Sequence, residues 1–191
     1  ASGQPVPNFY AGAPLAATPL VGFKGIFHGD AKAPAKKFVF DVLAGTPTAA
    51  MLGHYRLMDY LMFYAAIDGD AAGDVQDMDN TIPLPRYESG VGVRAMMVAT
   101  SPMTGGGSFT YSYTNQDGDL RVSPTIPFNT VATPIASVPT GDPAIASMGG
   151  LFLPMVAGDT GIRDIVSVTI ISPAGGLIAI ALVRPLLSFA L

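Results

Sequence analysis

The sequence predicts an all-β protein of antiparallel strands, either a β-sandwich or a jelly-roll-like barrel, with an extended N-terminal arm and long loops. Three observations support this class. Short segments alternate apolar and polar residues or are rich in β-branched ones, and turn residues separate these segments. The chain also contains 22 Gly and 17 Pro among 191 residues, about a fifth of the total. Gly and Pro at this frequency interrupt helices and favour short strands joined by turns.

The clearest strand signal lies at residues 108–114. Strict alternation there places Phe109, Tyr111 and Tyr113 on one face. The stretch 115–118, Asn-Gln-Asp-Gly, is typical of a tight turn. A return strand is therefore predicted from residue 120, which completes a hairpin.

The uncharged stretch at residues 165–183 is nearly as long as a membrane-spanning helix. Its middle, residues 173–176, reads Pro-Ala-Gly-Gly. In a helix these residues would cost several kcal/mol, roughly 3 for Pro and about 1 for each Gly. We therefore predict two buried strands joined as a hairpin, and no membrane partner.

The remaining elements are less sharply marked. Further strands are predicted at residues 21–28, 37–42 and 93–100. Residues 51–66 are bulky throughout, so periodicity leaves helix and strand both open. Residues 67–92 are polar and rich in turn residues, which predicts a long loop.

Two regions are expected along the chain. Residues 1–20 are uncharged and rich in Pro, which blocks both helix and ladder hydrogen bonding. They include Phe9 and Tyr10, so an arm that orders against a neighbouring subunit is favoured over a flexible tail. Residues 21–191 are predicted to form a single β-rich domain. The start lacks the pattern of a signal peptide, so none is expected.

The composition excludes several classes of function. The net charge of −4 and the pI of about 4.8 argue against a nucleic-acid partner. The absence of Cys excludes disulfides and thiolate metal sites. Hydrophobic residues make up 49% and charged residues only 13%, about half the usual share. This is more apolar surface than a monomer of this size readily hides, which predicts a homo-oligomer.

The acidic part of the long loop is the candidate metal site. Its ligands would be four carboxylates: Asp68, Asp70, Asp74 and Asp79. Their spacing partly matches a calcium loop, in which a hard cation takes several oxygens. The fifth position is Ala72, and the twelfth is Asp79 rather than the longer Glu, so an EF-hand is not expected. Two interpretations stay open: an irregular Ca²⁺ site, or a solvated acidic loop that binds no cofactor.

No catalytic residues are predicted, and the chain is not expected to be an enzyme. His28 and His54 have no neighbouring His or Cys at ligand spacing. No Gly-x-Ser-x-Gly elbow is present. A hydrolase would need a cleft in which one of these histidines meets a carboxylate.

Aromatic and Met side chains cluster between residues 51 and 64. The members are Tyr55, Tyr60, Phe63, Tyr64, Met51, Met58 and Met62. Core packing and a subunit interface are both compatible with this composition, because an obligate interface resembles a core cut in half.

Several stretches resemble sequences in structural proteins of tailed bacteriophages. These are residues 55–60 (Tyr-Arg-Leu-Met-Asp-Tyr), 77–80 (Asp-Met-Asp-Asn) with 84–87 (Leu-Pro-Arg-Tyr), 113–118 (Tyr-Thr-Asn-Gln-Asp-Gly), 158–163 (Gly-Asp-Thr-Gly-Ile-Arg) with 166–169, and the Gly-Gly-Leu at 175–177. The resemblance implies a virion component on the capsid surface, a decoration or cement protein. Such proteins are commonly β-rich trimers that clamp the capsomers of the major capsid protein and have no catalytic residues.

Two other kinds of function remain open. One is a major capsid protein or a tail or connector structural protein, which would form shells or tubes by itself. The other is a glycan- or receptor-binding β-domain, which would bind ligands in a glycan screen.

Overall fold

The computed structural model describes residues 12–20, 54–128 and 151–190. These residues form nine strands and no helix. The strands are β1 (Ala17–Pro19), β2 (His54–Asp68), β3 (Val75–Asp77), β4 (Arg94–Ala99), β5 (Ser108–Asn115), β6 (Leu120–Val122), β7 (Ile126–Pro127), β8 (Ile162–Ser172) and β9 (Leu177–Ala190). The strands predicted at 21–28 and 37–42, and residues 1–11 of the predicted arm, lie outside the described residues.

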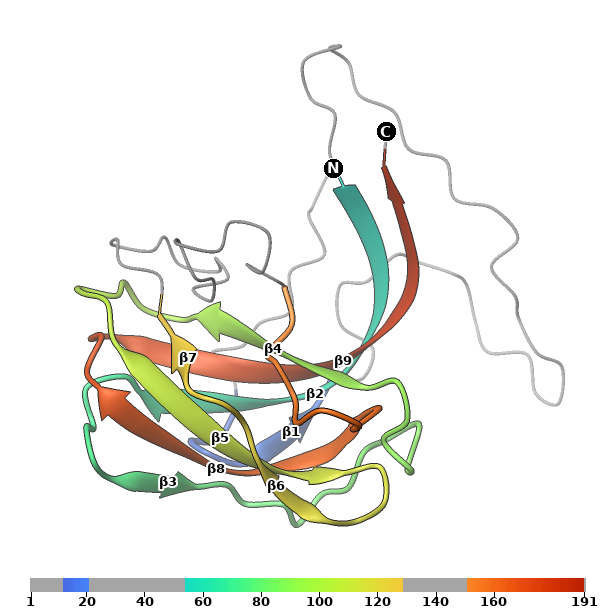
Figure 1. The fold of residues 1–191 in the computed structure, drawn as a ribbon, viewed down its shortest axis with the longest axis horizontal. Helices are drawn as coiled ribbons and strands as arrows, with labels where there is room; N and C mark the ends of the chain where they lie inside the picture. The colour runs from blue at the N-terminus through green and yellow to red at the C-terminus, as the bar shows by residue number, and fades with distance from the viewer. Residues whose placement is uncertain (1–11, 21–53, 129–150, 191) are drawn as a thin grey trace, which may run out of the picture.

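The strands form two antiparallel sheets (Figure 1). Sheet one has the order β1-β2-β9-β4, and sheet two has the order β3-β8-β5-β6, with β7 also paired to β5. Tyr64 and Ile180 of sheet one share a buried apolar cluster with Phe109 and Ile165 of sheet two. The two sheets therefore pack face to face, and the all-β prediction is confirmed for the described residues.

Strand β5 follows its sequence pattern closely. Burial alternates along it, with Phe109, Tyr111 and Tyr113 directed into the core. Strand β6 returns beside it, with Leu120 opposite Thr114. The predicted hairpin is confirmed.

Residues 51–66 were open to both helix and strand from the sequence. From residue 54 onward, the part that the structure describes, they form strand β2. Residues 61–65 are all buried, because sheet one has apolar contacts on both faces. Tyr64 joins the core between the sheets, whereas Phe63 joins a second apolar cluster on the outer face of sheet one. Burial of both faces removes the apolar-polar alternation by which a strand is usually recognised.

Strands β8 and β9 confirm two strands within residues 165–183, but the predicted hairpin is wrong. Strand β8 pairs with β3 and β5 in sheet two, whereas β9 pairs with β2 and β4 in sheet one. The turn between them crosses from one sheet to the other through Gly175 and Gly176, whose φ values are 71° and 73°. Ile170 and Ile178 thus face the same core from opposite sides. The described residues contain no helix that could span a membrane.

Strand β1 places the last part of the predicted arm within its own chain. It pairs antiparallel with β2, with Thr18 opposite Phe63, and Ala17 is buried. The backbone of Asp79 bonds to the other edge of this segment, through Ala17 and Leu15. Residues 14–20 are therefore an edge element of sheet one.

The far ends of β2 and β9 form a two-stranded ribbon, residues 54–60 and 184–190, which curves away from the sheets (Figure 1). Strand β4 accompanies β9 only over residues 178–183, and β1 accompanies β2 only over residues 62–64. No other described strand pairs with the ribbon.

Candidate functional site

The acidic loop is held by hydrogen bonds within the chain. Asp68 Oδ1 accepts a bond from the Asp70 N–H at 2.9 Å, and Asp79 Oδ1 accepts one from the Thr81 N–H at 2.9 Å. The side chain of Gln76 bonds to both backbone groups of Asp68, at 2.8 and 2.9 Å. These hydrogen bonds from the chain's own groups hold the turn.

The structure does not assemble the predicted metal ligands. Within the described residues, which include Asp68, Asp70, Asp74 and Asp79, no group of three or more His, Asp or Glu side chains could hold a metal ion. The described residues therefore bring together no group of three acidic side chains of the kind that the Ca²⁺ hypothesis expected.

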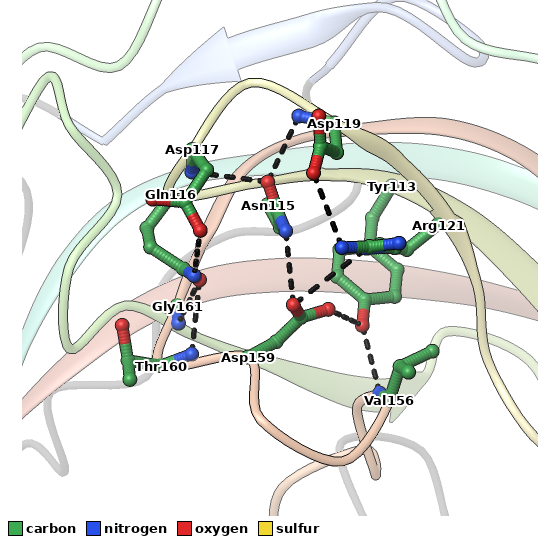
Figure 2. A network of polar contacts seen from close by, with 10 residues as sticks. All are labelled: Tyr113, Asn115, Gln116, Asp117, Asp119, Arg121, Val156, Asp159, Thr160 and Gly161. Atoms are coloured by element: carbon green, nitrogen blue, oxygen red, sulfur yellow. Dashed lines mark hydrogen bonds and ion pairs between the residues drawn. The ribbon is translucent and has the colours of Figure 1, made fainter.

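The most connected polar cluster lies instead around Asp159 (Figure 2). The Tyr113 hydroxyl donates to Asp159 Oδ2 at 2.6 Å, and Asn115 Nδ2 donates to Oδ1 at 2.9 Å. Arg121 Nε lies 3.7 Å from Oδ1. The Asp159 side chain is only 5% exposed, so these partners replace most of its hydration.

The turn between β5 and β6 holds the facing loop through two amide side chains (Figure 2). Asn115 Oδ1 accepts bonds from the backbone N–H groups of Asp117 and Asp119, at 3.0 and 2.9 Å. Gln116 Oε1 accepts bonds from Thr160 and Gly161, at 2.9 and 3.2 Å. We call the ten residues drawn in Figure 2 the Asp159 network: Tyr113, Asn115, Gln116, Asp117, Asp119, Arg121, Val156, Asp159, Thr160 and Gly161.

At neutral pH the network keeps the Asp159 carboxyl group ionised and the Tyr113 hydroxyl group protonated. Hydrogen bonds, first from Tyr113 and then from Asn115, lower the pKa of Asp159. Burial and the hydrogen bond to Asp159 raise the pKa of Tyr113 to about 12. A carboxylate with bonded oxygens and a neutral, buried phenol suit a structural contact between two loops.

The raised pKa of Tyr113 predicts its alkaline titration. The neutral phenol stabilises the fold fully below pH 10, the ordinary pKa, and this contribution is lost as the pH rises through about 12. We expect the Cζ resonance of ¹³C-labelled Tyr113, assigned with Tyr113→Phe, to titrate about two pH units above that of an exposed tyrosine. Titration of this resonance near pH 10 in the folded chain would contradict the network.

The base of the ribbon is braced by residues of a distant loop. Arg86 bonds to both carboxylate oxygens of Asp59, at 2.6 and 3.0 Å. Arg184 lies 4.3 Å from the centre of the Tyr87 ring and donates to the Val91 carbonyl at 2.9 Å. These contacts fix the direction in which the ribbon leaves the sheets.

Beyond this base the ribbon presents apolar side chains to solvent. Leu186 is 50% exposed and Leu187 is 44% exposed. The register shifts between Leu57, which lies opposite Leu187, and Met58, which lies opposite Pro185. This shift leaves Leu186 without an opposite residue, as at a β-bulge. The ribbon is the candidate interaction surface.

The other residues singled out from the sequence have mainly structural positions. Tyr64 lies in the core, and Tyr60 and Met58 pack beside Phe63 at the outer cluster. His54 is the first residue of β2, and His28 and Met51 lie outside the described residues. Core packing therefore accounts for Tyr64, and packing at the outer cluster for Phe63 with Met58 and Tyr60.

Sequence reasoning missed the Asp159 network and the Asp59–Arg86 pair. Asp59, Arg86, Tyr113 and Asp159 all lie in stretches that carried the phage resemblance, but no local spacing connects them. No family model, curated protein or solved structure matches the chain.

Proposed function

We propose that the chain is a non-enzymatic structural protein of a tailed-phage virion, of the capsid decoration or cement type. In this proposal it is made in the host cytoplasm, assembles as a homo-oligomer, a trimer, and binds the major capsid protein at the capsid surface. The supporting observation is the ribbon, which extends from the two sheets with exposed leucines.

A two-stranded ribbon is only marginally stable in water by itself. Its outer edges carry backbone groups that can pair with another strand, and such edges are normally shielded in monomers. A neighbouring subunit would cover Leu186 and Leu187 and supply a contact to the ribbon. Many copies on a symmetric shell would then add their affinities.

The proposal includes two finer features of the fold. One is a jelly-roll-like arrangement of the strands. The other is the predicted N-terminal arm, residues 1–20, that contacts a neighbouring subunit; its segment 14–20 also pairs with its own chain.

The leucines of the ribbon offer a direct test. We expect the Leu186→Glu, Leu187→Glu double variant to shift the chain from oligomer to monomer, because charged side chains resist burial between subunits. Its far-UV circular dichroism should stay that of the parent, since both side chains are exposed in the single chain and the fold does not depend on them. Size-exclusion chromatography with light scattering measures the mass.

The matched control is Leu120→Glu, because Leu120 is 64% exposed and lies on β6 of the other sheet. The control should keep the parent mass. A parent chain that is monomeric at high concentration, or an unchanged mass for the double variant, would overturn the ribbon interface.

Electron microscopy of the purified chain separates the structural alternatives. Discrete trimers support the decoration role, whereas shells or tubes support a major capsid or tail protein. Specific binding in a glycan array would favour the glycan- or receptor-binding alternative.

A further inference from the structure

Residues 151–161, which we call the strap, wrap around one border of sheet one. Leu151 and Phe152 pack against the apolar cluster on its outer face. Leu153 is buried in the core between the sheets, and Met155 and Val156 pack against that core. The strap therefore passes from the outer face of the sheet to its inner face.

This path covers the edge of β4. The N–H of Leu153 donates to the carbonyl of Ala95 at 2.8 Å, on β4, whose other neighbour in the sheet is β9. Strand β4 reads Arg-Ala-Met-Met-Val-Ala, and its last five residues are buried. An uncovered apolar edge of this kind is a template for pairing with another strand.

Between Leu153 and Thr160 the strap is held mainly by side chains of sheet two. The Tyr111 hydroxyl donates to the Pro154 carbonyl at 2.9 Å, and the Tyr113 hydroxyl accepts the Val156 N–H at 2.8 Å. The nearly buried carboxylate of Asp159 holds both Tyr113 and Asn115. One ionised group therefore joins this part of the strap to the β5–β6 hairpin.

Other charged groups surround Asp159 on each neighbouring element. Arg121 of β6 faces it and also pairs with Asp119 at 3.1 Å. Arg163 of β8 donates to the Gln116 carbonyl, and Asp164 accepts from Thr114 at 2.7 Å. From β4, Arg94 reaches the Met155 sulfur at 3.8 Å, and Asp117 is exposed at the tip of the turn. Among these carboxylates, only Asp159 belongs to the strap.

We propose that the strap is an acid-released cover of sheet one, in which protonation of Asp159 frees the strap from the β5–β6 hairpin and uncovers the edge of β4. This device does not rest on the proposed virion function. It concerns an opening within one chain and is tested on that chain.

The direction of the pH dependence follows from the bonds to the carboxylate. Both Asp159 oxygens accept hydrogen bonds, so the closed strap favours the charged form and its pKa lies below the ordinary range. The contribution to closure is complete above about pH 5, well above the ordinary pKa of an Asp, and is lost as the pH falls through the lowered value. Protonation removes the negative charge of Asp159 and adds a hydrogen to an oxygen that faces the donors of Tyr113, Asn115 and Arg121. The protonated side chain therefore binds these three partners less strongly.

Hydrogen–deuterium exchange of the full chain, followed by mass spectrometry, tests the device. After correction for intrinsic rates, we expect peptides covering 153–161 to exchange up to about threefold faster at pH 3.5 than at pH 7, the limit that one Asp with an ordinary open-state pKa sets, while β9 peptides keep their protection. Asp159→Asn, which cannot ionise, should show the fast strap exchange already at pH 7 and little further change at pH 3.5.

The matched control is Asp164→Asn, which removes a neighbouring carboxylate that does not contact the strap. It should behave as the parent at both pH values. If Asp159→Asn fails to fold, the parent and the control still decide the matter through their pH dependence. Equal acceleration of strap and β9, or no strap acceleration in the parent at pH 3.5, would overturn the proposal.

Discussion

Replacing Tyr64 by Ala is expected to destabilise the protein by about 3–5 kcal/mol, the usual cost of removing a buried aromatic side chain. Tyr64 is fully buried on β2 and packs in the core between the sheets. Its hydroxyl donates to Asn80 Oδ1 at 2.7 Å and accepts the N–H of Ile165, on β8, at 3.2 Å. The same side chain therefore fills the core and joins the two sheets.

The hydroxyl can be tested apart from the ring. Tyr64→Phe should cost about 1–3 kcal/mol, because the buried Ile165 N–H loses an acceptor. Tyr111→Phe is the matched control: its ring is equally buried, but its partner Pro154 is exposed, so water can replace the hydroxyl. Urea unfolding gives the three free energies, and a Tyr64→Phe loss no larger than that of Tyr111→Phe would contradict this role.

Local pattern predicts strands well where one face is buried and the other is not. Strand β5 alternates along its whole length, so the sequence predicted both the strand and its inward residues. Strand β2 is buried on both faces over residues 61–65, which removes the alternation. Whether this segment is a helix or a strand therefore depends on tertiary packing, which a short stretch of sequence does not reveal.

Pairing between strands is harder to predict than the strands themselves. The sequence predicts a turn at 173–176, but a turn alone does not say which sheet each flanking strand joins. Strands β8 and β9 are both apolar, and opposite placement lets Ile170 and Ile178 meet in one core. The crossing is a tertiary outcome, and the assumption that sequential strands pair was wrong here.

The candidate site shows the same limit. The acidic loop was found because its carboxylates lie close together in sequence, yet the described residues do not gather them around an ion. The contact between Tyr113 and Asp159 spans 46 residues, and that between Arg86 and Asp59 spans 27. Only the register of the sheets brings such residues together.

The high apolar content also has a more specific explanation. Residues 178–183 of β9 are fully buried on both faces, by the core on one side and the outer cluster on the other. Much of the low share of charged residues is therefore explained by burial within a single chain. The apolar side chains that remain exposed among the described residues are few and scattered, and Leu186 and Leu187 of the ribbon are two of them.

Replacing Gly161 by Ala is expected to have a comparably large effect for a steric reason. A Cβ at this position would overlap the carbonyl oxygen of Gly90 and lie 2.9 Å from the Gly92 nitrogen. These are backbone atoms, so no side-chain rotation relieves the overlap. Gly161 also bridges to Val91 and donates to Gln116, so a shift there would disturb the end of the strap.

We expect Gly161→Ala to cost about 3 kcal/mol, at the upper end for overpacking, and to lower the melting temperature by roughly 6–12 °C in a chain of this size. Gly105→Ala is the control, because a Cβ there meets no atom within 4 Å and the φ is not positive. It should leave the melting temperature unchanged or slightly raised, since Ala restricts the unfolded chain. Calorimetry compares the two variants, and equal melting temperatures would show that the Gly90–Gly161 contact does not constrain the fold.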